Sequence, residues 1–192
     1  SPVLLPDYVA LAPELTTTMP HKIAASTGVD ALCHLIECFT ASIANPVSDN
    51  YAMIGMKKLF ETIEQSVEQP DDLEAKLNML WASYYGGACI AHAGTHLVHA
   101  MSYPLGGKYH IPHGVANAIL LPHVMRYNAA YCGGKFADIA RAMGEKVEGR
   151  SEEEVRQAAV EAVCKLNRDV GIPPHLRDVG VREEDIPALA QA

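Results

Sequence analysis

The chain has 192 residues, an ordinary length for one domain, and 49% of them are apolar, which is enough for a buried core. A formal net charge of −8 argues against nucleic acid as a partner, and a mean hydropathy of +0.03 without a long apolar run argues against a membrane span. The five cysteines form no CxxC pair and the start does not resemble a signal peptide, which predicts reduced thiols and a cytoplasmic protein.

The first elements follow from local spacing and breaker residues. Residues 8–11, with the sequence Tyr-Val-Ala-Leu, are the only good strand candidate. A helix is expected from Pro20 to the break at residues 45–46, and the threonines at 16–18 are placed to cap its start. A second helix is expected over about residues 48–65.

The remaining elements are also predicted to be helices. One long helix is expected over residues 72–101, and the Tyr-Pro-Leu-Gly-Gly run at 103–107 is expected to end it. Further helices are expected over residues 115–125, over residues 135–143, and from the capping box at 151–154 to Gly171.

No repeat, low-complexity tract or long linker divides the chain. The sequence therefore predicts one all-α domain over residues 1–192, with one short N-terminal strand at most. Residues 1–6 carry no helix start signal and residues 187–192 stop inside a helical pattern. We therefore expect a fragment of a longer protein.

Two groups of residues suggest metal chemistry. Asp30 and His34 are four residues apart, so a helix places this carboxylate and imidazole side by side as half of a metal site. A second group follows at spacings of four, three and four, with two more histidines just beyond: His92, His96, His99 and Tyr103, then His110 and His113. Together they supply the three or four N/O ligands that a divalent metal requires.

The spacing does not decide which of these side chains bind. A single histidine on an apolar helix face is usually a hydrogen-bonded structural residue, and isolated i,i+4 pairs are common. On spacing alone, the natural choice is the set on one helix face: His92, His96 and His99.

Two longer motifs resemble a known family. Residues 27–37 (Thr-Gly-Val-Asp-Ala-Leu-Cys-His-Leu-Ile-Glu) and residues 99–118 resemble the metal-binding segments of the iron-dependent (group III) alcohol dehydrogenase family. The resemblance covers essentially the whole chain as that family's C-terminal helical domain, of the dehydroquinate synthase-like type. The run at 167–177 is most similar to the lactaldehyde reductase (1,2-propanediol oxidoreductase) branch.

The resemblance implies a specific ligand set. Carried over by position, the metal ligands are Asp30, His34, His99 and His113. The metal implied is Fe²⁺, with Zn²⁺ as a substitute. Glu37, one turn beyond His34, is a candidate to orient the His34 ring or to serve a helix-pair role.

The resemblance also implies a reaction, in which the metal polarises the oxygen of a small primary alcohol or diol while hydride moves to or from NAD(P). Tyr103 stands where relatives often have a histidine near the nicotinamide, which makes it a candidate catalytic residue. The residues that the family places near the nucleotide are Leu15, Thr16, Thr17 and Thr18; helix capping alone is the other interpretation of the threonines.

The sequence contains no Gly-rich phosphate loop between a strand and a helix. We therefore expect NAD(P) to bind mainly through an N-terminal domain outside this chain, and the isolated chain to be inactive. The full-length protein is expected to be a homo-oligomer acting on a small alcohol or aldehyde. Two alternatives stay open: a metal-dependent lyase or hydrolase, for which no general base is obvious, and a non-enzymatic helical interaction domain.

Overall fold

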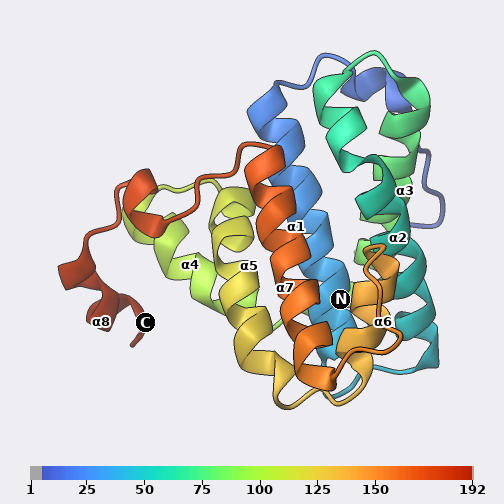
Figure 1. The fold of residues 1–192 in the computed structure, drawn as a ribbon. Coiled ribbons are helices and arrows are strands. Elements are labelled where there is room, and N and C mark those ends of the chain that lie inside the picture. Colours follow the sequence, from blue (N-terminus) through green and yellow to red (C-terminus); the bar gives the residue numbers. More distant parts are fainter. Residues whose placement is uncertain (1–5, 192) are drawn as a thin grey trace.

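A computed structural model describes residues 6–191, and its regular structure in that range is entirely helical (Figure 1). The elements are η2 (Pro13–Thr16), α1 (His21–Thr40), α2 (Pro46–Glu68), α3 (Leu73–Ala93), α4 (Leu97–Tyr109), α5 (His113–Ala129), α6 (Lys135–Ala142), α7 (Glu152–Asp169), η3 (Leu176–Val179), η4 (Glu183–Asp185) and α8 (Ile186–Leu189). The all-α prediction is confirmed. The predicted strand at 8–11 is wrong: these residues pair with no other segment in the described range, and Tyr8 is 95% exposed.

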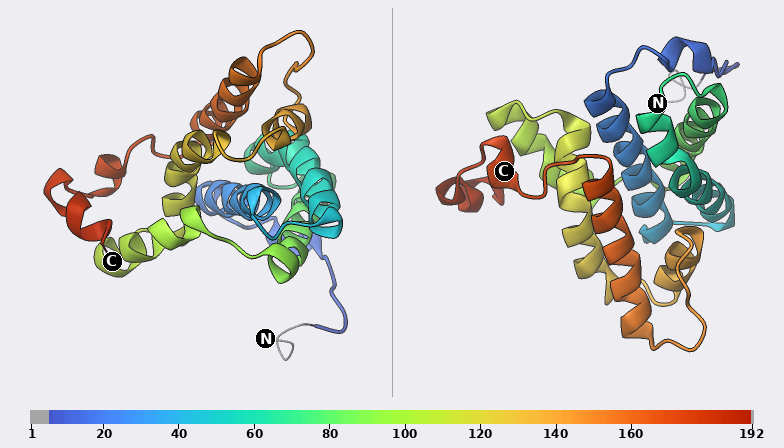
Figure 2. Two further views of the ribbon diagram at one scale, coloured as in Figure 1. Left: turned by 90° about the horizontal axis from the view of Figure 1, so that it is seen from below. Right: turned by 45° about the horizontal axis from the view of Figure 1, so that its top comes forward.

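Helix α1 lies at the centre of the fold, with α2 and α3 packed on one side and α5 on another (Figure 2). Its side chains are buried around most of its circumference, including Val29, Leu32 and Leu35, which are fully inaccessible to solvent. Helix α7 packs against α5 and α6. No helix within residues 6–191 combines the length and the apolar character needed to span a bilayer.

Local signals account for several helix starts. Asn45 caps α2 through the backbone N–H groups of Val47 and Ser48, Asp72 caps α3, and the expected Ser151 capping box opens α7. The start of α1 differs from expectation. The hydroxyls of Thr16 and Thr17 donate backwards to carbonyl oxygens in η2, and α1 begins without a side-chain cap.

The expected helix over residues 72–101 is in fact two helices. α3 ends at Ala93, where Gly94 adopts φ +68° and ψ 168°, a conformation open almost only to glycine. α4 then starts at Leu97 in a new direction and packs chiefly against α5, whereas α3 packs against α1 and α2 (Figure 2). The break therefore separates His92 from His99 and places them on different helices.

Residues 103–107 do not end a helix, contrary to expectation. α4 continues through Pro104 to Tyr109 and ends at His110, which takes the left-handed conformation with φ 55°. A proline inside a helix removes the N–H that would bond the carbonyl four residues earlier. For Pro104 this is the carbonyl of Ala100, which is an exposed residue.

The second internal proline, Pro122 in α5, is buried, so its missing N–H needs a protein replacement. The carbonyl four residues earlier belongs to Ala118, and it accepts a hydrogen bond from Asn167 Nδ2 of α7 at 2.7 Å. The buried Asn167 amide thus satisfies the carbonyl that Pro122 leaves without a donor, and it joins α7 to α5.

Candidate metal centre

Three helices bring one metal-ligating side chain each to a single point. Asp30 of α1, His99 of α4 and His113 of α5 offer ligand atoms that all lie within 4.8 Å of one another. Asp30 Oδ1 is 3.8 Å from His99 Nε2 and 3.9 Å from His113 Nε2. The Asp30 and His99 side chains are largely buried, whereas that of His113 is 45% exposed, so the cluster opens to solvent on the His113 side.

A glycine allows this approach of α5 to α1. A Cβ atom added to Gly114 would lie 2.5 Å from the backbone oxygen of Ser26 and 3.4 Å from Asp30 Cβ. Any larger residue would push the start of α5 away from α1. The glycine that follows His113 in the sequence therefore has a steric reason: it lets His113 reach Asp30.

His34, the fourth expected ligand, stands beside the cluster without being one of the three residues whose ligand atoms converge. Its ring stacks on that of His99, with 4.7 Å between the ring centroids and 26° between the planes. Burial lowers the pKa of His34, and the positive charges that His99 and His113 can carry add to this, while Asp30 opposes it. The effect favours the neutral imidazole, the form that binds metals.

Glu37 contacts a different ring from the one the sequence suggested. Its buried side chain meets His99, with 2.5 Å between Glu37 Oε2 and His99 Nδ1, and its other oxygen accepts the backbone N–H of Val98 at 2.6 Å. A carboxylate can only accept, so the proton of the His99 ring is assigned to Nδ1 and the lone pair to Nε2. The suggested pairing of Glu37 with His34 is therefore replaced by a pairing with His99.

Asn117 is the site residue that sequence reasoning missed. It lies one turn after His113 on α5 and is completely buried. Its Nδ2 is 2.6 Å from Asp30 Oδ1, 3.0 Å from His113 Nε2 and 3.2 Å from His99 Nε2. Its spacing of four from His113, inside an otherwise apolar run, is the sequence signal that could have found it.

The other histidines do not share a face with His99, so the choice of His92, His96 and His99 was wrong. His92 is exposed on α3, and His110 is exposed at the end of α4. His96 precedes α4, and its Nε2 donates to the backbone oxygen of Glu37 at 2.6 Å. Its role is therefore to join the start of α4 to α1.

Tyr103 lies next to the cluster but outside it. Its side chain is on α4, one turn beyond His99, and the residue is 65% exposed. Its ring stacks on the ring of His113, with 6.1 Å between centroids and 22° between planes. This position puts the phenol on the open side of the site.

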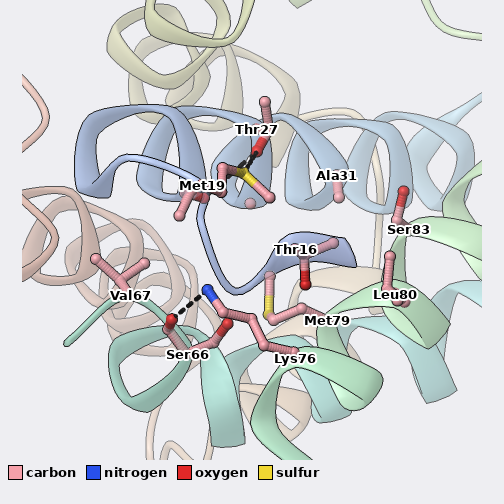
Figure 3. A pocket seen from close by; sticks show the side chains of 12 residues that line it. Thr16, Met19, Thr27, Ala31, Ser66, Val67, Lys76, Met79, Leu80 and Ser83 are labelled. Carbon is pink, nitrogen blue, oxygen red and sulfur yellow. Dashed lines mark hydrogen bonds between the residues drawn. The ribbon is translucent and has the colours of Figure 1, made fainter. Parts of the chain in front are cut away.

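Residues 15–18, the segment expected near a nucleotide, are separate from the three converging ligands. Thr16 of η2 lines a cavity of about 120 Å³ that also touches α1, α2 and α3, and Met19, Thr27 and Lys76 are among its other walls (Figure 3). None of the three converging ligands lines this cavity, which is smaller than the roughly 300–1,000 Å³ usual for ligand pockets. Leu15 is 83% exposed.

The donor set fits a divalent cation. It combines a carboxylate oxygen with two imidazole nitrogens, and the Glu37 contact turns the lone pair of His99 towards the other two donors. Imidazole and carboxylate ligands together suit iron and zinc better than calcium or magnesium, which prefer oxygen alone.

Comparisons with known proteins identify the family of the chain. E. coli K12 lactaldehyde reductase is 52% identical over 188 residues, which are 98% of this chain and 49% of the relative. A crystal structure of 1,3-propanediol oxidoreductase matches with a TM-score of 0.91 at 44% identity, over 93% of this chain and 47% of the other. Sulfoacetaldehyde reductase from Bifidobacterium kashiwanohense, solved in complex with NAD⁺, matches with a TM-score of 0.83 at 32% identity. The match covers 93% of this chain and 46% of the other.

The chain spans about half the length of the curated relatives it matches. The family match runs over residues 24–192. This range covers nearly all of α1, every later helix and all three converging side chains. Its description is that of the C-terminal part of the Fe-containing alcohol dehydrogenases. This chain belongs to the Fe-containing alcohol dehydrogenase family.

Proposed function

We propose that this chain is the metal-binding part of an NAD(P)-dependent alcohol dehydrogenase that interconverts a small primary alcohol or diol and its aldehyde. The observation that carries the proposal is the convergence of Asp30, His99 and His113 from three separate helices, with His34 stacked beside them. The family membership supports an alcohol or aldehyde oxidoreductase, and the relatives named above act on small aldehydes and diols.

In this proposal the cation is held by Asp30, His34, His99 and His113. Fe²⁺ is the expected ion and Zn²⁺ a substitute, because both accept imidazole and carboxylate ligands. A divalent cation here supplies a Lewis acid that polarises the oxygen of an alcohol or carbonyl group.

The chain's own residues prepare the site for this role. Glu37 orients the His99 ring, since its carboxylate meets Nδ1 and leaves Nε2 facing Asp30. The substrate is expected to approach where His113 and Tyr103 are exposed, and there the Tyr103 hydroxyl is available to donate a hydrogen bond to a substrate oxygen.

The NAD(P) part of the proposal rests on the relatives. One of them is solved with NAD⁺, and the described residues contain no strand-to-helix phosphate loop. In this proposal the nucleotide binds mainly outside this chain, and the residues of this chain that form one edge of its site are Leu15, Thr16, Thr17 and Thr18. We expect the isolated 192-residue chain to show no NAD-dependent alcohol oxidation.

A water-activating hydrolase or lyase is less well supported. It needs a general base free to take a proton beside the metal. Glu37, the further carboxylate in contact with His99, is buried and already accepts from His99 and Val98.

Metal analysis of paired histidine variants tests the proposal. His99→Ala should lose bound metal, because it removes a converging ligand, whereas His92→Ala should retain it, because His92 is exposed on α3. The measurement is elemental analysis of the purified variants after incubation with Fe²⁺ or Zn²⁺. Equal metal content in the two variants, or none in the unaltered protein, would contradict the proposal.

A further inference from the structure

The amide nitrogen of Asn117 lies within hydrogen-bond distance of all three converging ligands. The separations are 2.6 Å to Asp30 Oδ1, 3.0 Å to His113 Nε2 and 3.2 Å to His99 Nε2. The residue is fully buried, and its own Oδ1 has no hydrogen-bond partner in the described part of the chain. A buried polar group without a partner is costly, so this placement needs a reason.

The reason is the charge pattern of the neighbours. Asp30 presents a carboxylate oxygen, and His99 presents a lone pair at Nε2 because Glu37 holds the proton at Nδ1. The Asn117 NH₂ group is a donor only and carries partial positive charge. Turning the amide over would set its oxygen against these acceptors, so the network assigns Nδ2 to this position.

We propose that Asn117 competes with the metal cation for these three atoms. When no cation is bound, its two N–H groups are shared among the facing atoms of Asp30, His99 and His113 and offset the repulsion between them. When a cation binds, the same lone pairs turn to the metal and the Asn117 bonds are given up. This inference rests on the proposed metal centre and makes Asn117 a positioning residue that also weakens metal binding.

The competition has two opposite consequences for Asn117→Ala. The metal-free variant should unfold roughly 3–6 °C lower than the unaltered protein, because buried acceptors lose their donor. Its affinity for Zn²⁺ should rise about tenfold, since the cation no longer displaces hydrogen bonds worth about 1.4 kcal/mol. A residue that merely supported the fold would lower the unfolding temperature without raising the affinity.

Asn167 offers a matched control. It is also a buried asparagine whose amide nitrogen is satisfied and whose Oδ1 has no partner among residues 6–191, but its partner is the Ala118 carbonyl rather than a metal ligand. Asn167→Ala should lower the unfolding temperature with and without Zn²⁺ by similar amounts, and its Zn²⁺ affinity should equal that of the unaltered protein.

The experiment compares the unaltered protein, Asn117→Ala and Asn167→Ala after chelator treatment. Unfolding temperatures are measured with and without Zn²⁺, and Zn²⁺ affinity by calorimetric titration. Asn117→Ser, which keeps a polar group in the buried position, repeats the measurement if the alanine variant does not fold. The expected result is a larger Zn²⁺-induced rise in unfolding temperature for either Asn117 variant than for the unaltered protein.

The opposite results separate the two proposals. A Zn²⁺-induced rise in the unaltered protein that is equal or smaller in both Asn117 variants overturns the competition and leaves the metal centre intact. The absence of any Zn²⁺ or Fe²⁺ effect in the unaltered protein overturns the metal centre itself, and the competition with it.

Discussion

The side chain of Glu37, on α1, meets the Nδ1 atom of His99, on α4, at 2.5 Å, while His99 Nε2 faces the metal cluster. Because Glu37 is almost inaccessible to solvent, water cannot replace it as the partner of this ring. The contact sets both the orientation of the imidazole and the nitrogen that carries the proton.

Replacing Glu37 should therefore weaken metal binding. We expect Glu37→Gln to lower Zn²⁺ affinity about tenfold and Glu37→Ala about a hundredfold, the range usual for partners that orient a metal-ligating histidine. Calorimetric or chelator-competition titration checks this. Glu61→Gln is the control, because Glu61 is exposed on α2 and its salt bridge to Lys57 is 3.9 Å long. Unchanged affinity in both Glu37 variants would show that His99 needs no such support.

Replacing Gly114 should separate the ligands sterically. In Gly114→Ala the new methyl group would meet the Ser26 backbone oxygen at 2.5 Å, so α5 must shift and carry His113 away from Asp30. We expect a loss of about 1–3 kcal/mol in unfolding free energy together with weaker Zn²⁺ binding. Denaturant unfolding and Zn²⁺ titration measure the two effects. In Gly107→Ala the new methyl group would have no neighbour within 4 Å among the described residues apart from the backbone of its own helix, so the change should be neutral or slightly stabilising. Similar losses in both variants would refute the steric argument.

Thiol reactivity should divide the five cysteines by burial. Burial raises the pKa of Cys38 to about 12 and of Cys89 to about 11, and it raises the pKa of Cys33 well above its usual range. The thiolate is the reactive form, so each unit by which the pKa rises lowers the thiolate population at pH 8 about tenfold. In the folded protein we expect a thiol reagent to modify Cys132 and Cys164, which are half-buried, and the other three only on unfolding or at strongly alkaline pH. Mass spectrometry of the modified sites decides; rapid labelling of Cys33 at pH 8 would contradict the packing of α1.

Several helix starts are set by neighbouring residues: those after Asp72 and Ser151 were predicted, and the one after Asn45 was placed two residues late. Asn45, Asp72 and Ser151 each bond backbone N–H groups two or three residues away, so the signal and its effect lie in the same short segment. The division of residues 72–101 into two helices was not predicted because distant contacts stabilise it. Cys38 Sγ contacts the carbonyl of Gly94, and His96 Nε2 the carbonyl of Glu37, across 56 and 59 residues.

The site shows the same contrast. Helical spacing correctly put Asp30 and His34 on one face of α1, but it joined His92 to His99 because the break at Gly94 was not recognised. Family resemblance pointed instead to His99 and His113, which the fold brings to Asp30. Neither approach found Asn117: its spacing of four from His113 puts the two on one helix face but does not say which residues of other helices that face meets.

The hydrogen bond between Asn167 and the Ala118 carbonyl makes the residue needed at position 167, on α7, depend on the residue at position 122, on α5. The Ala118 carbonyl is free to accept from Asn167 because Pro122 has no N–H to donate to it. Pro122 is in turn tolerated in a buried helix because Asn167 supplies the missing donor. A substitution at either position alone leaves an unpaired polar group in the core, whereas a change at both removes the requirement. In related proteins, Pro122 of α5 and Asn167 of α7 should therefore be replaced together or not at all.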